Sequence, residues 1–179
     1  MKKIFFLLTA AIITGTASAQ TFTLKSKDLG GQFTNKQYAN FMGYTGENQS
    51  PELSWENAPA GTQSFAVTMY DLDAPTGSGF WHWVVYNIPV STTELKVGAG
   101  DVNKKLLPAG ALQGNTDMGT PGYIGPAPTP GPAHQYIFTV YALKSMLTLD
   151  KNATAAFTGF NISANVIAKA SIVAYAQKQ

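Results

Sequence analysis

The chain of 179 residues contains no cysteine. This absence excludes disulfide bonds, thiolate nucleophiles, zinc sites with cysteine ligands and lipid attachment at a cysteine. A domain without disulfides must be stabilised by its hydrophobic core alone, and a chain of this length can bury a core of sufficient size. The sequence therefore predicts a fold that depends on packing rather than on covalent cross-links.

Arginine is also absent, so every basic residue is a lysine, and only 12% of the residues are charged. Planar, two-pronged recognition of phosphate or carboxylate groups by arginine is therefore excluded. The sequence has no basic cluster of the kind that binds nucleic acids or membrane surfaces. Histidine occurs only twice, at His82 and His134. Any imidazole chemistry must use one or both of these residues.

The first nineteen residues have the pattern of a secretory signal peptide. Lys2 and Lys3 form a positive start, residues 4–13 are apolar, and residues 17–19 form an Ala-Ser-Ala cleavage site. The apolar stretch is too short to span a bilayer comfortably. We expect residues 1–19 to be removed, residues 20–179 to form a single domain, and the protein to be periplasmic or secreted. Loss of the two lysines lowers the formal charge from +2 to 0.

The stretch from Ser64 to Pro89 organises the rest of the chain. It reads as two hydrophobic strands joined by a polar loop that begins with Asp71-Leu72-Asp73-Ala74-Pro75. The first strand is apolar on both faces, which predicts that it is covered on both sides. In the second strand, strict alternation predicts Trp81 and Trp83 on one face, with His82 and Ile88 on the other. A polar loop between buried strands is a common position for a binding site.

The remaining chain predicts a β-rich body with few helices. Residues 22–26, 94–97 and 134–143 have the alternation of strands. Residues 99–132 are rich in glycine and proline, and a loop of that length in a compact domain is usually functional. Two helices are expected, a short one at 151–157 and an amphipathic one at 162–176, where apolar residues recur with helical spacing.

Two aspartates, two histidines and one tyrosine are the candidate site residues. Asp71 and Asp73 lie on one side of an extended segment, and His134 and Tyr136 share a strand face. An aspartate can hold one nitrogen of an imidazole and leave the other free for a ligand. Each residue alone has a structural interpretation as well, because aspartates form turns and single histidines are often satisfied in a core.

Five motifs in sequence order resemble the phosphatidylethanolamine-binding protein family, and in particular its bacterial branch that is called Raf-kinase-inhibitor-like. The motifs are Ser50-Pro51-x-Leu53-x-Trp55, Asp71-x-Asp73-Ala74-Pro75, His82-Trp83-Val84-x-Tyr86-Asn87-Ile88-Pro89, Gly122-Tyr123-x-Gly125-Pro126 and His134-x-Tyr136-x-Phe138-x-Val140-Tyr141-Ala142-Leu143. The resemblance runs from about Phe22 to Tyr175.

The resemblance implies a mainly β fold with a central antiparallel Greek-key sheet, a smaller second sheet and peripheral helices, here including a C-terminal helix. It also implies a small surface pocket for anions such as phosphate or a phospholipid headgroup. The family's ligand-binding residues fall on Asp71, Asp73, Ala74, His82, Gly125, His134 and Tyr136. The chain departs from the family pattern where Leu72 replaces a proline and Gln135 replaces an arginine.

The leading hypothesis is therefore a periplasmic or secreted binding protein whose pocket takes a small anionic or zwitterionic ligand, such as phosphate or phosphoethanolamine. One alternative is a protein-interaction module that modulates a kinase, a protease or a host-cell process, with residues 99–132 as its surface. A homodimer is a separate assembly that the sequence leaves open. A less favoured alternative is an acid–base hydrolase that uses the histidines and aspartates. The sequence has no serine elbow and no HExxH motif. We expect no enzymatic activity, no metal and no cofactor.

Overall fold

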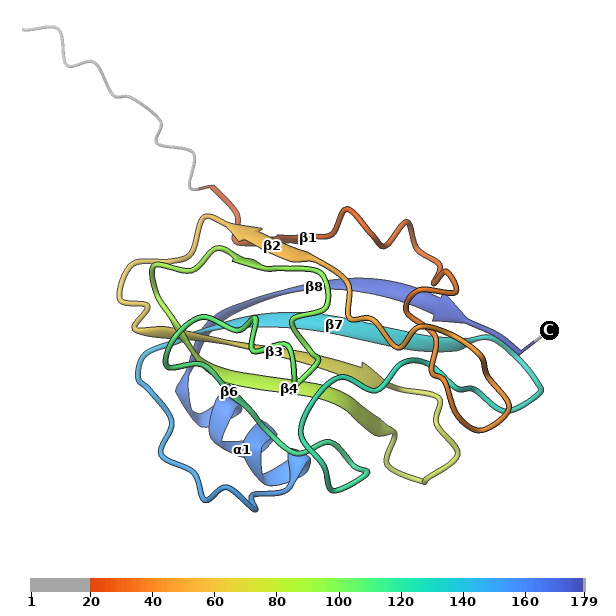
Figure 1. Ribbon diagram of the computed structural model, residues 1–179. Coiled ribbons are helices and arrows are strands. Elements are labelled where there is room, and N and C mark those ends of the chain that lie inside the picture. Colours follow the sequence, from red (N-terminus) through yellow and green to blue (C-terminus); the bar gives the residue numbers. More distant parts are fainter. Residues whose placement is uncertain (1–19, 179) are drawn as a thin grey trace, which may run out of the picture.

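The computed structural model describes residues 20–178, so the predicted signal peptide lies outside the described residues. These residues form two antiparallel sheets and one helix (Figure 1). The small sheet has the order β1-β2-β5, and the large sheet has the order β6-β4-β3-β7-β8. The elements are β1 (Thr23–Lys25), β2 (Leu53–Glu56), β3 (Ser64–Asp71), β4 (Phe80–Pro89), β5 (Glu94–Leu95), β6 (Leu112–Gln113), β7 (His134–Leu143), α1 (Ala155–Asn165) and β8 (Val166–Ala176). The mainly β fold with a large and a small sheet is confirmed.

The main core lies between the two sheets. Trp55 of the small sheet is buried with Phe65, Trp83 and Phe138 of the large sheet. The opposite face of the large sheet carries a smaller cluster in which Ile162 of α1 contributes to the burial of Ala66 and Tyr86. In Figure 1 the small sheet and α1 accordingly lie on opposite sides of the large sheet. The prediction that the Phe65 strand is covered on both faces is confirmed.

Strand β4 does not alternate strictly, because it contains β-bulges. Met69 pairs with Trp83 and Tyr70 pairs with Trp81, so His82 is an extra residue on β4. Trp83 therefore belongs to the main core, whereas Trp81 packs against Tyr70. The sequence prediction that the two tryptophans share a face is wrong, because one extra residue reverses the side on which all following side chains lie.

A second bulge lies near the end of β4. The register moves from Val67–Val85 to Phe65–Ile88, and Asn87 has a positive φ of 58°. Strict alternation predicts that Ile88 shares a face with Val84. Because of the bulge, Ile88 instead belongs to the main core with Trp83. The Asn87 side chain links the end of β4 to the loop after β7. It accepts a hydrogen bond from the main-chain N–H of Leu147 at 2.7 Å and donates one to the Leu147 carbonyl at 2.9 Å.

The helix predicted at 162–176 is largely absent. The structure instead has helix α1, which begins at Ala155 with Thr154 as its N-cap and ends at Asn165. From Val166 to Ala176 the chain is strand β8, paired antiparallel with β7 along its length. The segment contains valine, isoleucine and tyrosine, which favour strands, and its helical spacing was outweighed by pairing with β7 and by burial of Ala174 and Ala176. No helix among residues 20–178 is both long and apolar enough to cross a bilayer.

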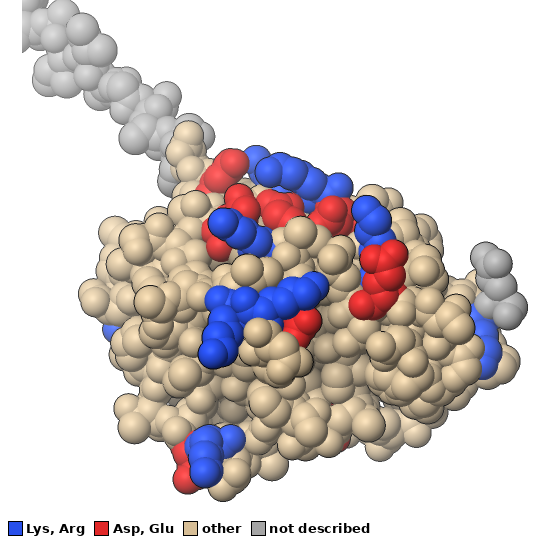
Figure 2. All heavy atoms as spheres, viewed as in Figure 1, with Lys and Arg blue, Asp and Glu red and all other residues tan. Residues whose placement is uncertain are grey.

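Charged side chains are unevenly distributed over the surface. On the face shown in Figure 2 they gather over the small sheet, where Lys25 lies 2.9 Å from Glu56. Helix α1 contains no charged residue. The exposed Lys25–Glu56 pair contributes little to stability.

Candidate functional site

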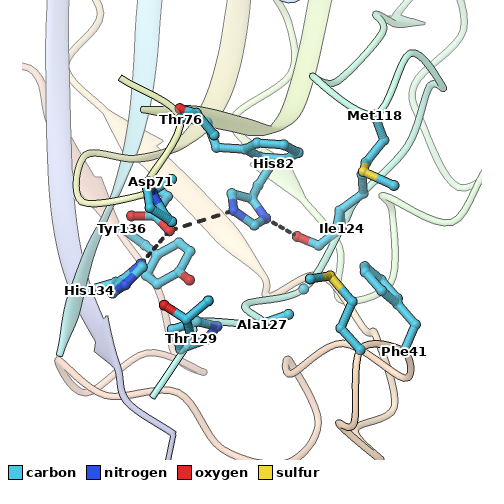
Figure 3. Close-up of a pocket in the computed structure, with 16 residues that line it drawn as sticks. Phe41, Asp71, Thr76, His82, Met118, Ile124, Ala127, Thr129, His134 and Tyr136 are labelled. Carbon is cyan, nitrogen blue, oxygen red and sulfur yellow. Dashed lines mark hydrogen bonds and ion pairs between the residues drawn. The ribbon is translucent and has the colours of Figure 1, made fainter. Parts of the chain in front are cut away.

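A pocket of about 240 Å³ opens at one end of the large sheet (Figure 3). It lies where β3 ends and where β4 and β7 begin, and residues from the 41–42 and 118–129 loops complete its wall. The lining residues are Phe41, Met42, Asp71, Ala74, Pro75, Thr76, Phe80, His82, Met118, Ile124, Gly125, Ala127, Pro128, Thr129, His134 and Tyr136. No lysine among residues 20–178 lines the pocket, so Asp71, the two histidines and Tyr136 are its titratable groups.

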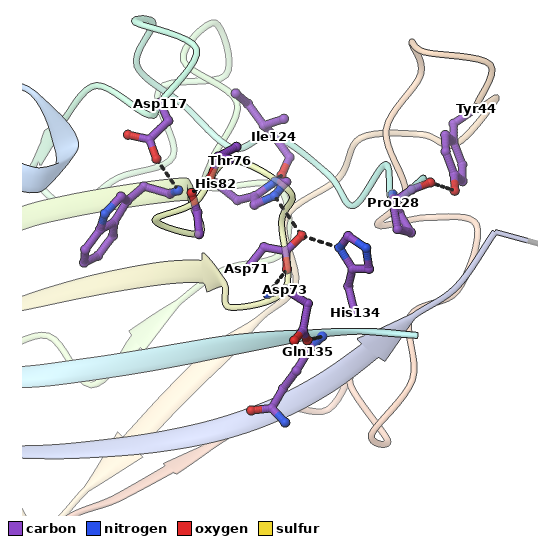
Figure 4. A network of polar contacts seen from close by, with 12 residues as sticks. Tyr44, Asp71, Asp73, Thr76, His82, Asp117, Ile124, Pro128, His134 and Gln135 are labelled. Carbon is purple, nitrogen blue, oxygen red and sulfur yellow. Dashed lines mark hydrogen bonds and ion pairs between the residues drawn. The ribbon is translucent and has the colours of Figure 1, made fainter. Parts of the chain in front are cut away.

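Asp71 is the centre of the polar network in the pocket (Figure 4). It is the last residue of β3 and is only 2% exposed. Its Oδ1 accepts a hydrogen bond from the main-chain N–H of Asp73 at 2.9 Å, as in an Asx turn. Its Oδ2 accepts from Nδ1 of His134 at 2.8 Å. The buried carboxylate is therefore held in place from both of its oxygens.

His82 reaches the pocket because it is the extra residue of the bulge in β4. Its Nδ1 lies 2.9 Å from the carbonyl oxygen of Ile124, and its Nε2 lies 4.0 Å from Oδ2 of Asp71. Burial lowers the pKa of His82 from its ordinary 6.5 to about 4, although the Ile124 carbonyl and Asp71 act in the opposite direction. His82 is therefore neutral at pH 7, with its proton on Nδ1.

Tyr136 contributes a hydroxyl that is buried and has no hydrogen-bond partner within residues 20–178. Its ring packs edge-on against His82, with 5.2 Å between ring centroids. Burial raises the pKa of Tyr136, and Asp71 raises it further through its negative charge and through weak hydrogen bonding, although no acceptor within residues 20–178 lies at normal hydrogen-bond distance from the hydroxyl. The hydroxyl therefore keeps its proton at neutral pH and is a donor without a well-formed hydrogen bond within residues 20–178. Such groups are costly in a protein interior and call for a functional explanation.

The outer wall of the pocket is a loop fixed to the rest of the fold through its main chain. Ile124 N–H donates to the His82 carbonyl at 2.9 Å, and Gly125 N–H donates to Oδ1 of Asn48 at 2.7 Å. The Tyr44 hydroxyl donates to the Pro128 carbonyl at 2.7 Å. These bonds hold the wall at a set distance from the sheet.

The structure brings the predicted site residues together, with one exception. Asp71, Ala74, His82, Gly125, His134 and Tyr136 all line the pocket. Asp73 is exposed and does not line it; its Oδ2 accepts from the main-chain N–H of Gln135 at 2.7 Å. Asp73 thus ties the end of β3 to the start of β7, a supporting role.

Sequence reasoning missed the apolar lip of the pocket. Phe41, Met42 and Met118 lie at the pocket, and the two methionines are more than half exposed. Phe41 belongs to an irregular aromatic segment with no periodicity, so no local pattern indicates its position. At Gln135, where the family usually has arginine, the side chain donates weakly to the Tyr175 hydroxyl at 3.4 Å. It adds no charge to the pocket.

Comparison with known proteins gives a consistent result. Residues 23–177 match the family model described as phosphatidylethanolamine-binding protein. The UPF0098 protein YbhB of Escherichia coli K12 is 49% identical over 154 residues, which cover 84% of this chain and 97% of YbhB. The UPF0098 protein YbcL of the same organism is 44% identical over 176 residues, which cover 96% of each chain.

Solved structures of two relatives have a similar fold. The crystal structure of Escherichia coli YbcL, described as a new member of the mammalian PEBP family, has a TM-score of 0.85 at 43% identity and covers 88% of this chain and 99% of YbcL. A phosphatidylethanolamine-binding protein homolog from Chlamydia trachomatis has a TM-score of 0.73 at 26% identity and covers 88% of this chain and 98% of its own.

Proposed function

Because the chain belongs to the phosphatidylethanolamine-binding protein family, we propose that it is a binding protein whose pocket takes a small phosphate-containing ligand. One observation carries the proposal: the protonated Tyr136 hydroxyl is buried beside Asp71 and His134 and makes no well-formed hydrogen bond within residues 20–178. A phosphate oxygen in the pocket is the acceptor that this group lacks. The proposal is one of binding without catalysis.

The charges around the pocket favour modest affinity. With no arginine or lysine in the lining, the anion is held by hydrogen bonds. A zwitterionic ligand such as phosphoethanolamine suits the pocket because its ammonium group complements the Asp71 carboxylate. The apolar lip formed by Phe41, Met42 and Met118 suits a ligand with hydrocarbon next to its phosphate.

The 99–132 segment supports this proposal over the alternative of a protein-interaction module. Tyr123, within this segment, is 5% exposed and donates from its main chain to the Gly100 carbonyl at 2.9 Å. The segment packs against the body and supplies the pocket wall from Met118 to Thr129. Its contribution to the pocket wall supports the proposal of a small-ligand site. We place the mature protein in the periplasm or outside the cell, on the pattern of residues 1–19.

The direct test is an NMR titration of the chain from Gln20, first with inorganic phosphate and then with phosphoethanolamine. We expect saturable shifts of the His82 and His134 imidazole resonances, because both rings line the pocket. The Trp83 indole serves as an internal reference, because it donates to Oε1 of Gln113 at 2.8 Å and does not line the pocket. Absence of a shift at both histidines would remove the basis of the proposal.

Replacement of Tyr136 by phenylalanine is expected to separate binding from stability. The change removes a buried hydroxyl without a partner, so the free energy of unfolding should stay the same or rise by about 1 kcal/mol. Phosphate binding should weaken roughly tenfold, because one hydrogen bond to the anion is lost. Urea unfolding and the NMR titration measure the two effects. Tyr141→Phe, on the opposite face of β7, is the control that should leave binding unchanged; a loss of stability in Tyr136→Phe would mean that the hydroxyl is already satisfied.

A further inference from the structure

His82 presents a free acceptor to the pocket. Its Nδ1 lies 2.9 Å from the Ile124 carbonyl oxygen, and because a carbonyl oxygen can only accept, Nδ1 carries the hydrogen. In the neutral ring Nε2 then has a lone pair. Nε2 lies 4.0 Å from Oδ2 of Asp71, which is too far for a hydrogen bond and is another acceptor. Within residues 20–178 no donor reaches this nitrogen.

Asp71 adds further accepting capacity at the same place. Each of its oxygens accepts one hydrogen bond, from Asp73 N–H and from His134 Nδ1, which leaves lone pairs on both. The carboxylate is 2% exposed, so its charge is little screened by water. A ligand that approaches Nε2 of His82 therefore also approaches a buried negative charge.

The pocket floor thus has one donor without an acceptor, the Tyr136 hydroxyl, beside two acceptors that can still be used, His82 and Asp71. An oxyanion with no hydrogen of its own can accept a hydrogen bond from the Tyr136 hydroxyl, but its lone pairs then face the lone pairs of His82 and Asp71, which is unfavourable. An oxyanion that also brings a donor satisfies both sides. The donor can be a P–OH group or an ammonium group in the same ligand.

On this geometry, and resting on the proposed function, we propose that the pocket selects oxyanions whose own ligand brings a hydrogen-bond donor for Nε2 of His82 over oxyanions without one. Hydrogenphosphate and phosphomonoester monoanions meet this condition through P–OH. A zwitterionic headgroup meets it through its ammonium group. Sulfate and simple phosphodiesters are similar in shape and do not meet it. His82 is in this view the residue that determines specificity.

Two pairs of ligands with equal charge test the proposal on the unchanged chain from Gln20. At about pH 8 hydrogenphosphate and sulfate both carry two negative charges, and only the first has a hydrogen to donate. At about pH 5, below the second pKa of a phosphomonoester at about 6, monomethyl phosphate and dimethyl phosphate both carry about one negative charge, and only the first has P–OH. Burial of an unpaired lone pair is costly, so in each pair the donor-bearing ligand should bind at least about tenfold more tightly in NMR or calorimetric titrations.

The outcomes distinguish this proposal from the one on which it rests. If both members of each pair bind equally, the donor requirement is overturned and the phosphate pocket stands. If no ligand of either pair binds, both proposals fail. Glycerophosphoethanolamine then tells two sources apart: tight binding identifies the ammonium group of a lipid headgroup as donor, and weak binding identifies free phosphate or a monoester. Both results are compatible with the donor requirement.

The assignment to His82 has its own test in the His82→Asn variant. Asparagine places an amide N–H near the position of Nδ1, so the bond to the Ile124 carbonyl can be kept, and it removes the lone pair of Nε2. We expect the phosphate-to-sulfate preference to fall from at least about tenfold toward equality. An unchanged preference in a folded variant would assign the selection to Asp71 instead and overturn the role of His82. The ligand pairs on the unchanged chain decide the proposal if this variant does not fold.

Discussion

Replacement of Gly125 by alanine should unfold the pocket wall and lower the free energy of unfolding by about 3 kcal/mol or more. A Cβ at this position would lie 2.2 Å from the Gln37 carbonyl oxygen, 2.5 Å from the Ala39 nitrogen and 2.7 Å from the Tyr38 carbonyl carbon. All three are main-chain atoms, so no flexible side chain can move aside. The two segments must separate, and the bond from Ala39 N–H to the Pro126 carbonyl at 3.1 Å lies directly between them.

The same substitution should abolish ligand binding, because Phe41 and Met42 follow one of these segments and Ile124 and Ala127 flank the other. Urea unfolding measures the stability, and the phosphate titration measures the pocket. Gly30→Ala is the matched control: a Cβ there has nothing within 4 Å, and Gly30 does not have a positive φ. We expect the control to be neutral or slightly stabilising. Equal stabilities of the two variants would contradict the close approach at Gly125.

Acidification between about pH 6.5 and pH 4 should destabilise the protein through His82 by roughly 3 kcal/mol. Burial holds the pKa of His82 at about 4 in the folded chain, against 6.5 in the unfolded chain. Within this window the unfolded state binds a proton that the folded state does not, so stability falls as the pH falls. Above the window both states are neutral at this residue and the full contribution is present. Below pH 4 this residue causes no further loss.

His82→Asn isolates this effect from the carboxylates, which titrate in the same window in both proteins. We expect the difference in free energy of unfolding between pH 7 and pH 4 to be smaller in the variant by roughly 3 kcal/mol. The comparison is of slopes with pH, so a constant loss of stability in the variant does not affect it. Identical slopes would show that His82 is accessible to protons in the folded state.

Local sequence patterns predicted the central strands and most of the pocket residues of this protein. Residues 64–71 are apolar on both faces and residues 134–143 alternate, and these two patterns placed two central strands correctly. A strand that is covered on both sides must be apolar on both faces. The motifs around Asp71, His82 and His134 identified residues that meet at one pocket although 63 positions separate Asp71 from His134. The lack of cysteine and arginine, a property of composition alone, excluded whole classes of chemistry.

Only the tertiary structure decided how these parts are used. Residues 166–176 form a strand because β7 offers them a partner, and a pairing between distant segments is invisible in local spacing. The bulge that turns His82 into the pocket depends on the register with β3, which one extra residue shifts. Asp73 lies outside the pocket because it bonds the main chain of Gln135. The Tyr136 hydroxyl makes no well-formed hydrogen bond because of the groups that surround it in the folded chain. The sequence specifies the residues and their order, whereas burial and hydrogen bonding across the fold assign each of them its role.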